Sequence, residues 1–344
     1  MNRRFLLSRI PLVVALGLDL FFRTGPLGEL MPPPNPFRAA FAAQDAHTEE
    51  LLALPGVVGT AIGLGPDGRP VLKVYVAMAG AAMLPMAYGE VPVVETVTGR
   101  FVSLVEEPSP DAPTNPRAHF PRPVPIGVSS GQPDVTAGTI GARALAGGKV
   151  FALSNNHVFA NSNKAKVGDN VLQPGRADGG ADPDDAIGTL YDFEPIQHCG
   201  RGPFPCPENR IDAAIALTSP DRVGNSTPPG GYGTPRAKTV EAKLGMRVQK
   251  YGRTTGHTRG LIDGIRATIT VGYPGGQARF VDQIIISGGG FSAPGDSGSL
   301  VVTDGSGAQD RRPVGLVFAG SQLASIANPI DLVLDRFGIT IDGN

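Results

Sequence analysis

The sequence predicts a mainly β protein with one helix near its C-terminus. Residues 126–344 contain short apolar runs separated by turn residues about every ten positions, such as KVFALS, SLVVT and PVGLVF. Glycine (47) and proline (33) are abundant while 41% of residues are hydrophobic, a composition typical of a turn-rich, well-packed fold. In NPIDLVLDRFG the period becomes helical, with Asn328 and Pro329 at the start and Gly338 at the end. This pattern favours β-barrels or a sandwich.

Composition divides the chain into four segments. Residues 1–36 are an apolar leader and a proline-rich spacer, and residues 37–107 form a small α+β module without an expected catalytic group. In that module an Ala-rich helix precedes two predicted strand pairs, one turning at Pro-Asp-Gly and one at Thr-Gly. Residues 108–125 hold so many prolines that we expect a stiff, extended linker. Residues 126–344 form the main β domain.

The leader contains an export-like pattern. MNRRFLL places two arginines before an apolar run and loosely matches a twin-arginine signal. Arg9, Pro11 and Asp19 interrupt the run, so we expect no stable membrane-spanning helix. We expect an exported protein, periplasmic or secreted, with a cytoplasmic location as the alternative.

Two cysteines, Cys199 and Cys206, lie close together in QHCGRGPFPCPEN. A disulfide closing this Gly/Pro-rich loop agrees with export, whereas two free surface thiols in a cytoplasmic protein are the alternative. Two thiols alone make a poor zinc site.

Charge and acidic residues exclude several classes of partner. Thirty basic and 31 acidic residues give a net charge of −1, so no nucleic-acid partner is expected. The loop at residues 177–188 contains Asp178, Asp182, Asp184 and Asp185, but its spacing is not a calcium-loop signature and a solvated acidic loop is favoured. We expect no metal and no cofactor.

The segment APGDSGSLVV at residues 293–302 raises the question of catalysis. Ser297 is either a nucleophile on a tight turn or part of a polar hairpin loop, because small polar residues and glycine occur in most turns. A nucleophilic serine needs a base, and the base needs an acid. His157 ends the apolar strand of LSNNHV, and Asp212 leads into the apolar strand of IDAAIAL, where a carboxylate must be paired.

These motifs together resemble a known family. The order His157, Asp212, Ser297, with LSNNHV, IDAAIAL, GDSGSLVV and VGLVFAGS, resembles the trypsin/chymotrypsin-like serine peptidases over roughly residues 125–337. The sequence is most similar to bacterial members without the vertebrate disulfides and to plant narrow-leaf-type proteins. The resemblance implies two antiparallel β-barrels with the site between them, His157 and Asp212 in the first barrel and Ser297 in the second.

The same resemblance implies the role of each residue. Ser297 would attack the scissile carbonyl, His157 would act as base and then acid, and Asp212 would orient the imidazole. The N–H groups of Gly295 and Ser297 would form the oxyanion hole. Glycine at position 295 suits a turn that aims successive N–H groups at one point.

Asp296 lies beside this oxyanion loop and needs a partner for its charge. Bacterial relatives use an arginine in a strand-turn that resembles GRTTG, and this chain has YGRTTGHTRG at residues 251–260. We therefore expect Arg253 to pair with Asp296, while an exposed arginine in a hairpin is the alternative. GRTTG lacks the Gly-Lys-Ser/Thr of a phosphate-binding loop. His257, which follows it, is expected to be a surface or hydrogen-bonded residue.

The resemblance places the primary substrate pocket on two short segments. These are the residues before the serine and the strand after it, namely Phe291, Ser292, Phe318, Ala319 and Gly320. Neither segment contains an acid, which disfavours a preference for Lys or Arg and favours an apolar or shallow pocket. Phe318 departs from the small polar residue usual at its position, and core packing is the expectation for at least one of the two phenylalanines.

We expect a serine endopeptidase that acts on polypeptides through an acyl-enzyme. The alternative is an idle or latent protein on a peptidase fold that binds peptides or proteins, because fold does not fix function. The sequence predicts no oligomeric state.

Overall fold

The computed structural model describes residues 35–104, 115–200 and 206–344, and the chain from Pro36 to Asn344 forms one compact unit. The expected leader and the first part of the expected linker lie outside the described residues. The helices are α1 (Arg38–Leu52), α2 (Asn156–Phe159) and α3 (Ile330–Phe337), with 3-10 turns at Arg176–Asp178 and Gly307–Gln309.

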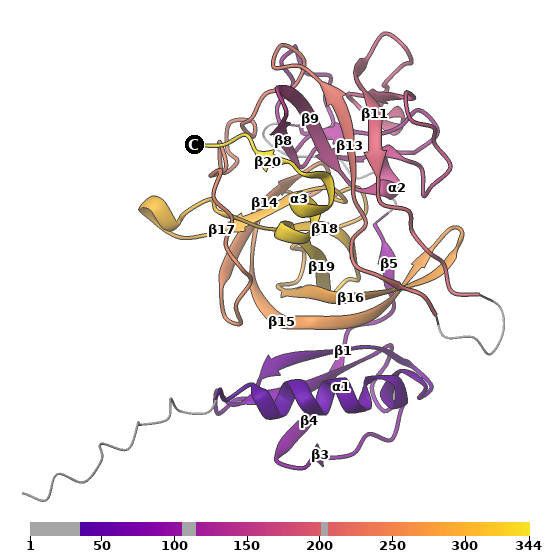
Figure 1. The fold of residues 1–344 in the computed structure, drawn as a ribbon, viewed down its shortest axis with the longest axis vertical. Helices are drawn as coiled ribbons and strands as arrows, with labels where there is room; N and C mark the ends of the chain where they lie inside the picture. The colour runs from indigo at the N-terminus through magenta and orange to yellow at the C-terminus, as the bar shows by residue number, and fades with distance from the viewer. Residues whose placement is uncertain (1–34, 105–114, 201–205) are drawn as a thin grey trace, which may run out of the picture. The chain divides into compact units, whose positions relative to one another are not determined.

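The first strand system is a six-stranded antiparallel sheet (Figure 1). Its order is β10 (Asn170–Leu172), β11 (Ala186–Phe193), β13 (Ala214–Thr218), β9 (Lys149–Ser154), β8 (Ala142–Ala146) and β20 (Thr340–Ile341). The register of β9 on β13 pairs Ser154 with Ala214. His157 follows β9 and Asp212 precedes β13, so this pairing brings the two strand ends and their side chains together.

The second strand system contains a closed ring of six strands, because β15 pairs with both β14 and β16. Around the ring lie β14 (Arg247–Gly252), β15 (Gly256–Tyr273), β16 (Gly276–Ser287), β19 (Ala324–Pro329), β18 (Pro313–Gly320) and β17 (Leu300–Thr303). The short β12 (Glu208–Asn209) adds to β16, and β6 (Ser129–Ser130) pairs separately with β7 (Gly138–Thr139). Ser297 lies immediately before β17.

The N-terminal segment is joined to this ring by hydrogen bonds. It contains α1, β1 (Val57–Leu64), β2 (Pro70–Val76), β3 (Ala87–Tyr88), β4 (Val91–Val97) and β5 (Phe101–Ser103). The predicted hairpin of β1 and β2 is present, and β1 also pairs with β15. The expected division into a module, a linker and a β domain stays a prediction, although the first and last of these share one sheet.

The second predicted hairpin of this segment was wrong. Strand β4 pairs in parallel with β2, and β5 leaves it to pair in parallel with β15 and antiparallel with β18. The reason is burial, since Phe101 and Leu104 reach 2% and 3% exposure there. In strand β4, by contrast, Val91 alone is buried.

The fold class predicted from the sequence is confirmed: the chain is mainly β, with an antiparallel six-stranded sheet, an antiparallel six-stranded ring, a C-terminal helix and a preceding α+β segment. Helix α3 packs on β18 and β19 (Figure 1) and ends at Gly338, whose φ of +60° is one that glycine adopts readily. The bond between Cys199 and Cys206 is present. Among the described residues, none of the helices is long and apolar enough to cross a membrane.

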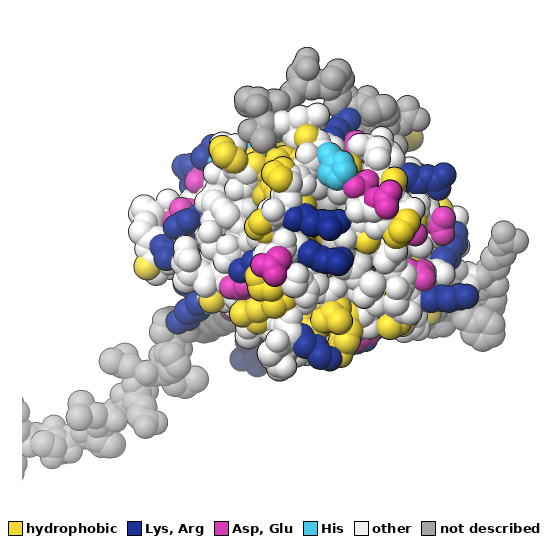
Figure 2. All heavy atoms as spheres, turned by 90° about the horizontal axis from the view of Figure 1, so that it is seen from above, with side chains coloured by type: hydrophobic (Ala, Val, Ile, Leu, Met, Phe, Trp, Pro, Cys, Tyr) yellow, Lys and Arg dark blue, Asp and Glu magenta, His cyan; other side chains and the backbone are white. Residues whose placement is uncertain are grey.

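Charged side chains of both signs are interspersed over the face in Figure 2. This agrees with the near balance of 30 basic and 31 acidic residues.

Candidate active site

His157 and Asp212 form a buried pair at the paired strand ends. Nδ1 of His157 lies 2.6 Å from Oδ2 of Asp212, and the backbone N–H of His157 donates to Oδ1 at 3.2 Å. Asp212 is fully buried and His157 is 5% exposed. With Nδ1 against a carboxylate, the proton of the neutral ring lies on Nδ1 and Nε2 is left as an acceptor.

Tyr273 is a third member of this cluster, and sequence analysis missed it. It ends β15, and its hydroxyl donates to Oδ2 of Asp212 at 2.8 Å. Burial, and secondarily the charge of Asp212, raise the pKa of Tyr273 well above 10, so the hydroxyl remains a donor. The sequence around Tyr273, next to a Pro-Gly-Gly turn, does not indicate this role, because its contact with Asp212 spans 61 residues.

The Ser297 turn is held by glycine and by a neighbouring loop. Gly295 and Gly298 have φ values of +95° and +93°, which L side chains rarely adopt. Thr139 of the short strand β7 fixes the turn: its Oγ1 donates to the Gly295 carbonyl at 2.9 Å, and its N–H donates to the Ser297 carbonyl at 2.8 Å.

The carbonyl oxygen of Leu104 occupies the space in front of this turn. It accepts from the Gly295 N–H at 2.9 Å and from Oγ of Ser297 at 3.5 Å. Oγ of Ser297 also donates to the carbonyl of Phe318 at 3.3 Å. Nε2 of His157 is buried and has no hydrogen-bond partner among the residues that the structure describes, so the hydrogen bond between serine and histidine is not formed in this state.

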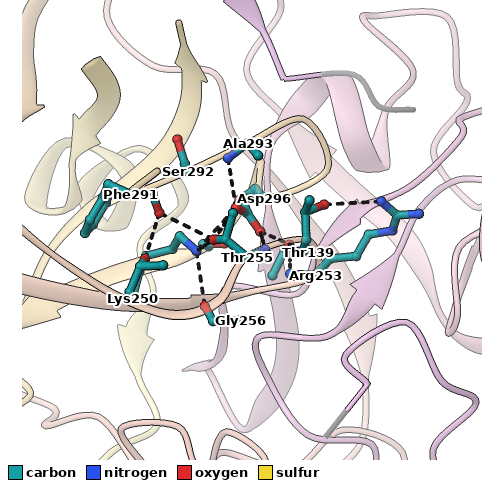
Figure 3. Close-up of polar contacts among 12 residues, drawn as sticks. Thr139, Lys250, Arg253, Thr255, Gly256, Phe291, Ser292, Ala293 and Asp296 are labelled. Carbon is teal, nitrogen blue, oxygen red and sulfur yellow. Dashed lines mark hydrogen bonds and ion pairs between the residues drawn. The ribbon is translucent and has the colours of Figure 1, made fainter. Parts of the chain in front are cut away.

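The Asp296 carboxylate is surrounded by donors from two segments (Figure 3). Its Oδ1 accepts from the N–H groups of Thr254 at 2.8 Å and Thr255 at 3.2 Å. Its Oδ2 accepts from the Thr255 hydroxyl at 2.7 Å and the Ala293 N–H at 3.0 Å. The GRTTG segment therefore does hold Asp296, but through backbone and threonine groups.

The cation beside Asp296 is Lys250. Its Nζ lies 3.3 Å from Oδ2 of Asp296 and donates to the Thr255 hydroxyl and the Gly256 carbonyl, and both charged side chains are fully buried. Burial lowers the pKa of Lys250, and Asp296 opposes this shift. The signal in the sequence was a lone lysine inside the strand RVQKYG, since a lysine is almost never fully buried unless paired.

The expected direct contact of Arg253 with Asp296 is not among those of the described residues; burial lowers the pKa of Arg253, and the Asp296 charge opposes this shift from a longer distance. The Arg253 guanidinium points away from Asp296 (Figure 3) and donates to Asp178 from Nε at 2.5 Å and from Nη2 at 2.7 Å. Arg253 is therefore not an exposed arginine either, being 1% exposed. A planar guanidinium matches a carboxylate with two parallel bonds, which explains why the acidic loop captures it.

The acidic loop is tied to the fold at both ends. Asp178 also accepts from the Ser129 hydroxyl at 2.5 Å, and Asp185 pairs with His119 at 2.8 Å. The described residues contain no cluster of three or more potential metal ligands. His257 is hydrogen-bonded as predicted, to Gln249 and to the Gly230 carbonyl.

The predicted pocket residues separate into two groups. The Phe318 side chain packs into the barrel core against Phe280, so it is a core residue. Phe291 packs in an apolar cluster that also contains Leu104. Ser292 and Gly320 line a cavity of about 740 Å³. Ala319 pairs with Ser103 of β5.

Comparisons with known proteins connect part of this chain to one family model. The Nal1 C-terminal domain matches residues 236–327, which include Ser297 but neither His157 nor Asp212. No curated protein matches the sequence.

Several solved structures are similar to part of this chain at low identity. A glutamic-acid-specific serine protease is 18% identical, covers 63% of this chain and 100% of its own, and has a TM-score of 0.45. Thermobifida fusca protease A is 19% identical over 64% of this chain and 100% of its own, with a TM-score of 0.45. Nocardiopsis protease is 19% identical over 63% and 99%, with a TM-score of 0.42. At these values the likenesses assign neither activity nor substrate to this chain.

Proposed function

We propose that this protein is a serine endopeptidase that uses Ser297 as nucleophile, His157 as general base and acid, and Asp212 to orient the imidazole. One observation supports this most strongly. The Ser297 hydroxyl and the Gly295 N–H both contact a single peptide carbonyl oxygen, that of Leu104. A nucleophile and an oxyanion donor must converge on one carbonyl in this way.

The reaction follows from the positions of the side chains. Nε2 of His157 is buried and free to accept, so a rotation of the Ser297 hydroxyl toward it would transfer the serine proton as Oγ attacks. Asp212, held by Tyr273 and the His157 backbone, stabilises the imidazolium that forms. The imidazolium protonates the leaving amine, and a water molecule then hydrolyses the acyl-enzyme.

A second candidate is a latent or idle peptidase-fold protein that binds peptides. It is favoured by the same state of the site, because Ser297 donates to the Phe318 and Leu104 carbonyls instead of to His157. The first candidate accommodates the same state, because catalytic hydrogen bonds are often long or misdirected until the reactive complex forms.

Turnover of an unfolded polypeptide separates these candidates. The natural chain and Leu104→Asp would be compared with Ser297→Ala and His157→Ala. Leu104→Asp is included because a carboxylate is unfavourable in the apolar site of Leu104 and should release this segment from the space in front of Ser297. We expect hydrolysis to fall by roughly 10⁴-fold or more in the Ser297 and His157 variants. If the natural chain binds the polypeptide but none of the four proteins hydrolyses it, the second candidate is favoured.

A further inference from the structure

Strand β5 occupies the edge of β18 as an extended peptide would. Ser103 lies opposite Ala319 and Val102 opposite Gly320 in an antiparallel register. Adding a strand to a sheet edge is a common way to bind a peptide in an extended form. Ala319 and Gly320 directly follow Phe318, whose carbonyl contacts Ser297. The strand therefore leads its next residue, Leu104, directly to the nucleophile.

The Leu104 peptide group is placed as a reacting group. Its carbonyl oxygen lies 2.9 Å from the Gly295 nitrogen, a distance suited to a donor that stabilises a developing oxyanion. The same oxygen lies 3.5 Å from Oγ of Ser297. The Gly295 N–H and the Ser297 hydroxyl therefore meet the chain just past the end of β5, which ends at Ser103.

The Leu104 side chain fills an apolar site beside the serine. It is 3% exposed and packs in a cluster with Phe291 and Val317. It also faces Gly320, since a Cβ placed on that glycine would lie 3.5 Å from Cδ2 of Leu104. A cation borders this cluster, since Nζ of Lys250 lies 5.9 Å from the centroid of the Phe291 ring, but it is paired with Asp296. The site fits an aliphatic side chain of this size.

We propose that Phe101–Leu104 is the enzyme's own substrate segment and that the chain cuts itself after Leu104. This inference rests on the serine peptidase function proposed above. Oγ of Ser297 bonds to the Leu104 carbonyl carbon while His157 takes the serine proton. The peptide bond to the next residue breaks, and His157 gives the proton to the departing amine. Water then hydrolyses the ester, which leaves a Leu104 carboxylate and restores Ser297.

The same contacts define the substrate class. The residue that donates the acyl group is aliphatic and of leucine size, and the two residues before it are extended along Ala319 and Gly320. Val102, third from the cut, lines the cavity of about 740 Å³ together with Ser292 and Gly320. As long as β5 stays paired with β18, it competes with other polypeptides for the strand edge at Ala319 and Gly320.

The direct test is the mass of the full chain after incubation, measured under denaturing conditions so that fragments that stay associated are still resolved. We expect one fragment that ends at Leu104 and a complementary one that begins at the following residue. Ser297→Ala should give neither fragment. Leu104→Met, which keeps an unbranched apolar side chain of similar volume, should be cut within about tenfold of the natural rate.

Leu104→Asp is the matched negative variant. Its carboxylate should reduce the cut at this position by about 100-fold or more, because burying a charge among apolar side chains is unfavourable and the nearby Lys250 is already paired with Asp296. Its thermal unfolding would be recorded beside that of the natural chain to verify that it folds. In the same protein, labelling of Ser297 by a fluorophosphonate reports whether the nucleophile is active when the cleft is freed.

The outcomes separate the two proposals. Cutting after Leu104 in the natural chain and in Leu104→Met, but not in Ser297→Ala or Leu104→Asp, supports the inference. Labelling of Leu104→Asp without any cut in the natural chain overturns it and leaves the peptidase function standing. Neither labelling nor cutting means that the proposed function fails and the inference fails with it.

Discussion

The hydroxyl of Tyr273 donates to Oδ2 of Asp212 at 2.8 Å, and this same carboxylate oxygen faces Nδ1 of His157. Tyr273 belongs to the second strand system, whereas Asp212 and His157 belong to the first. Its ring also lies edge-on to the imidazole, with centroids 6.0 Å apart. The tip of the β15–β16 hairpin thus orients the acid and encloses the base.

Replacing Tyr273 by Phe should lower kcat about tenfold or more while leaving KM nearly unchanged. The hydroxyl donates to a charged, fully buried acceptor, and hydrogen bonds of this kind contribute about 1.5–3 kcal/mol. Steady-state kinetics on a Leu-containing peptide measures both constants. Tyr232→Phe is the control, because the buried Tyr232 hydroxyl has no hydrogen-bond partner in the described parts of the chain and its removal should change neither constant. A Tyr273→Phe enzyme with natural kcat would show that the hydroxyl does not position Asp212.

Lys250→Met should lower the free energy of unfolding by about 3–5 kcal/mol, because it leaves the buried Asp296 carboxylate without its cation. Denaturant unfolding measures the change. Combining it with Asp296→Asn should recover part of the loss, since both charges are then gone. Strictly additive losses in the two single variants and the double variant would contradict a direct interaction between these side chains.

Gly295→Ala should lower kcat about 10²–10³-fold with a much smaller effect on folding. At a φ of +95° a side chain is strained, and relief of that strain moves the N–H away from the carbonyl oxygen it contacts. Gly245→Ala provides a matched control, since Gly245 has a φ of +77°, open space around it and no contact with the site. Equal losses of activity in both variants would point to strain alone.

Stability should fall as the pH is lowered from 7 toward 5, in part because of His257. Burial, with a smaller effect of the Arg259 charge, lowers the pKa of His257 below its ordinary value of 6.5. The unfolded chain then binds the proton first as the pH falls, which stabilises the unfolded state. His257→Gln should flatten the pH dependence of the free energy of unfolding in this range. An unchanged slope would show that His257 does not titrate differently in the folded chain.

The residues that we assign to catalysis could be predicted because each of them lies directly beside an apolar strand. LSNNHV and IDAAIAL both mark buried strands, and the pairing of Ser154 with Ala214 then brings His157 to Asp212. Glycine at position 295 was likewise expected to suit the turn, and its φ is positive, as such a turn requires. Their roles in catalysis stay predictions.

Long-range partners could not be predicted from local patterns. Arg253 was placed on the right segment, but its carboxylate partner, Asp178, lies 75 residues away in a loop read as solvated. The apolar alternation of RFVSLV indicated a strand but not the strand with which it pairs. A hairpin with the preceding strand was expected because that strand is the closest one in the sequence. Burial of Phe101 against the barrel overrides that choice.

The central claim is that Ser297 is an activated nucleophile, and fluorophosphonate labelling followed by intact mass measurement tests it most directly. Leu104→Asp and Leu104→Asp/Ser297→Ala would be treated side by side. We predict one added phosphonyl group in the first protein, mapped to Ser297, and none in the second. Equal labelling of both proteins, or no labelling of the first, would contradict the claim.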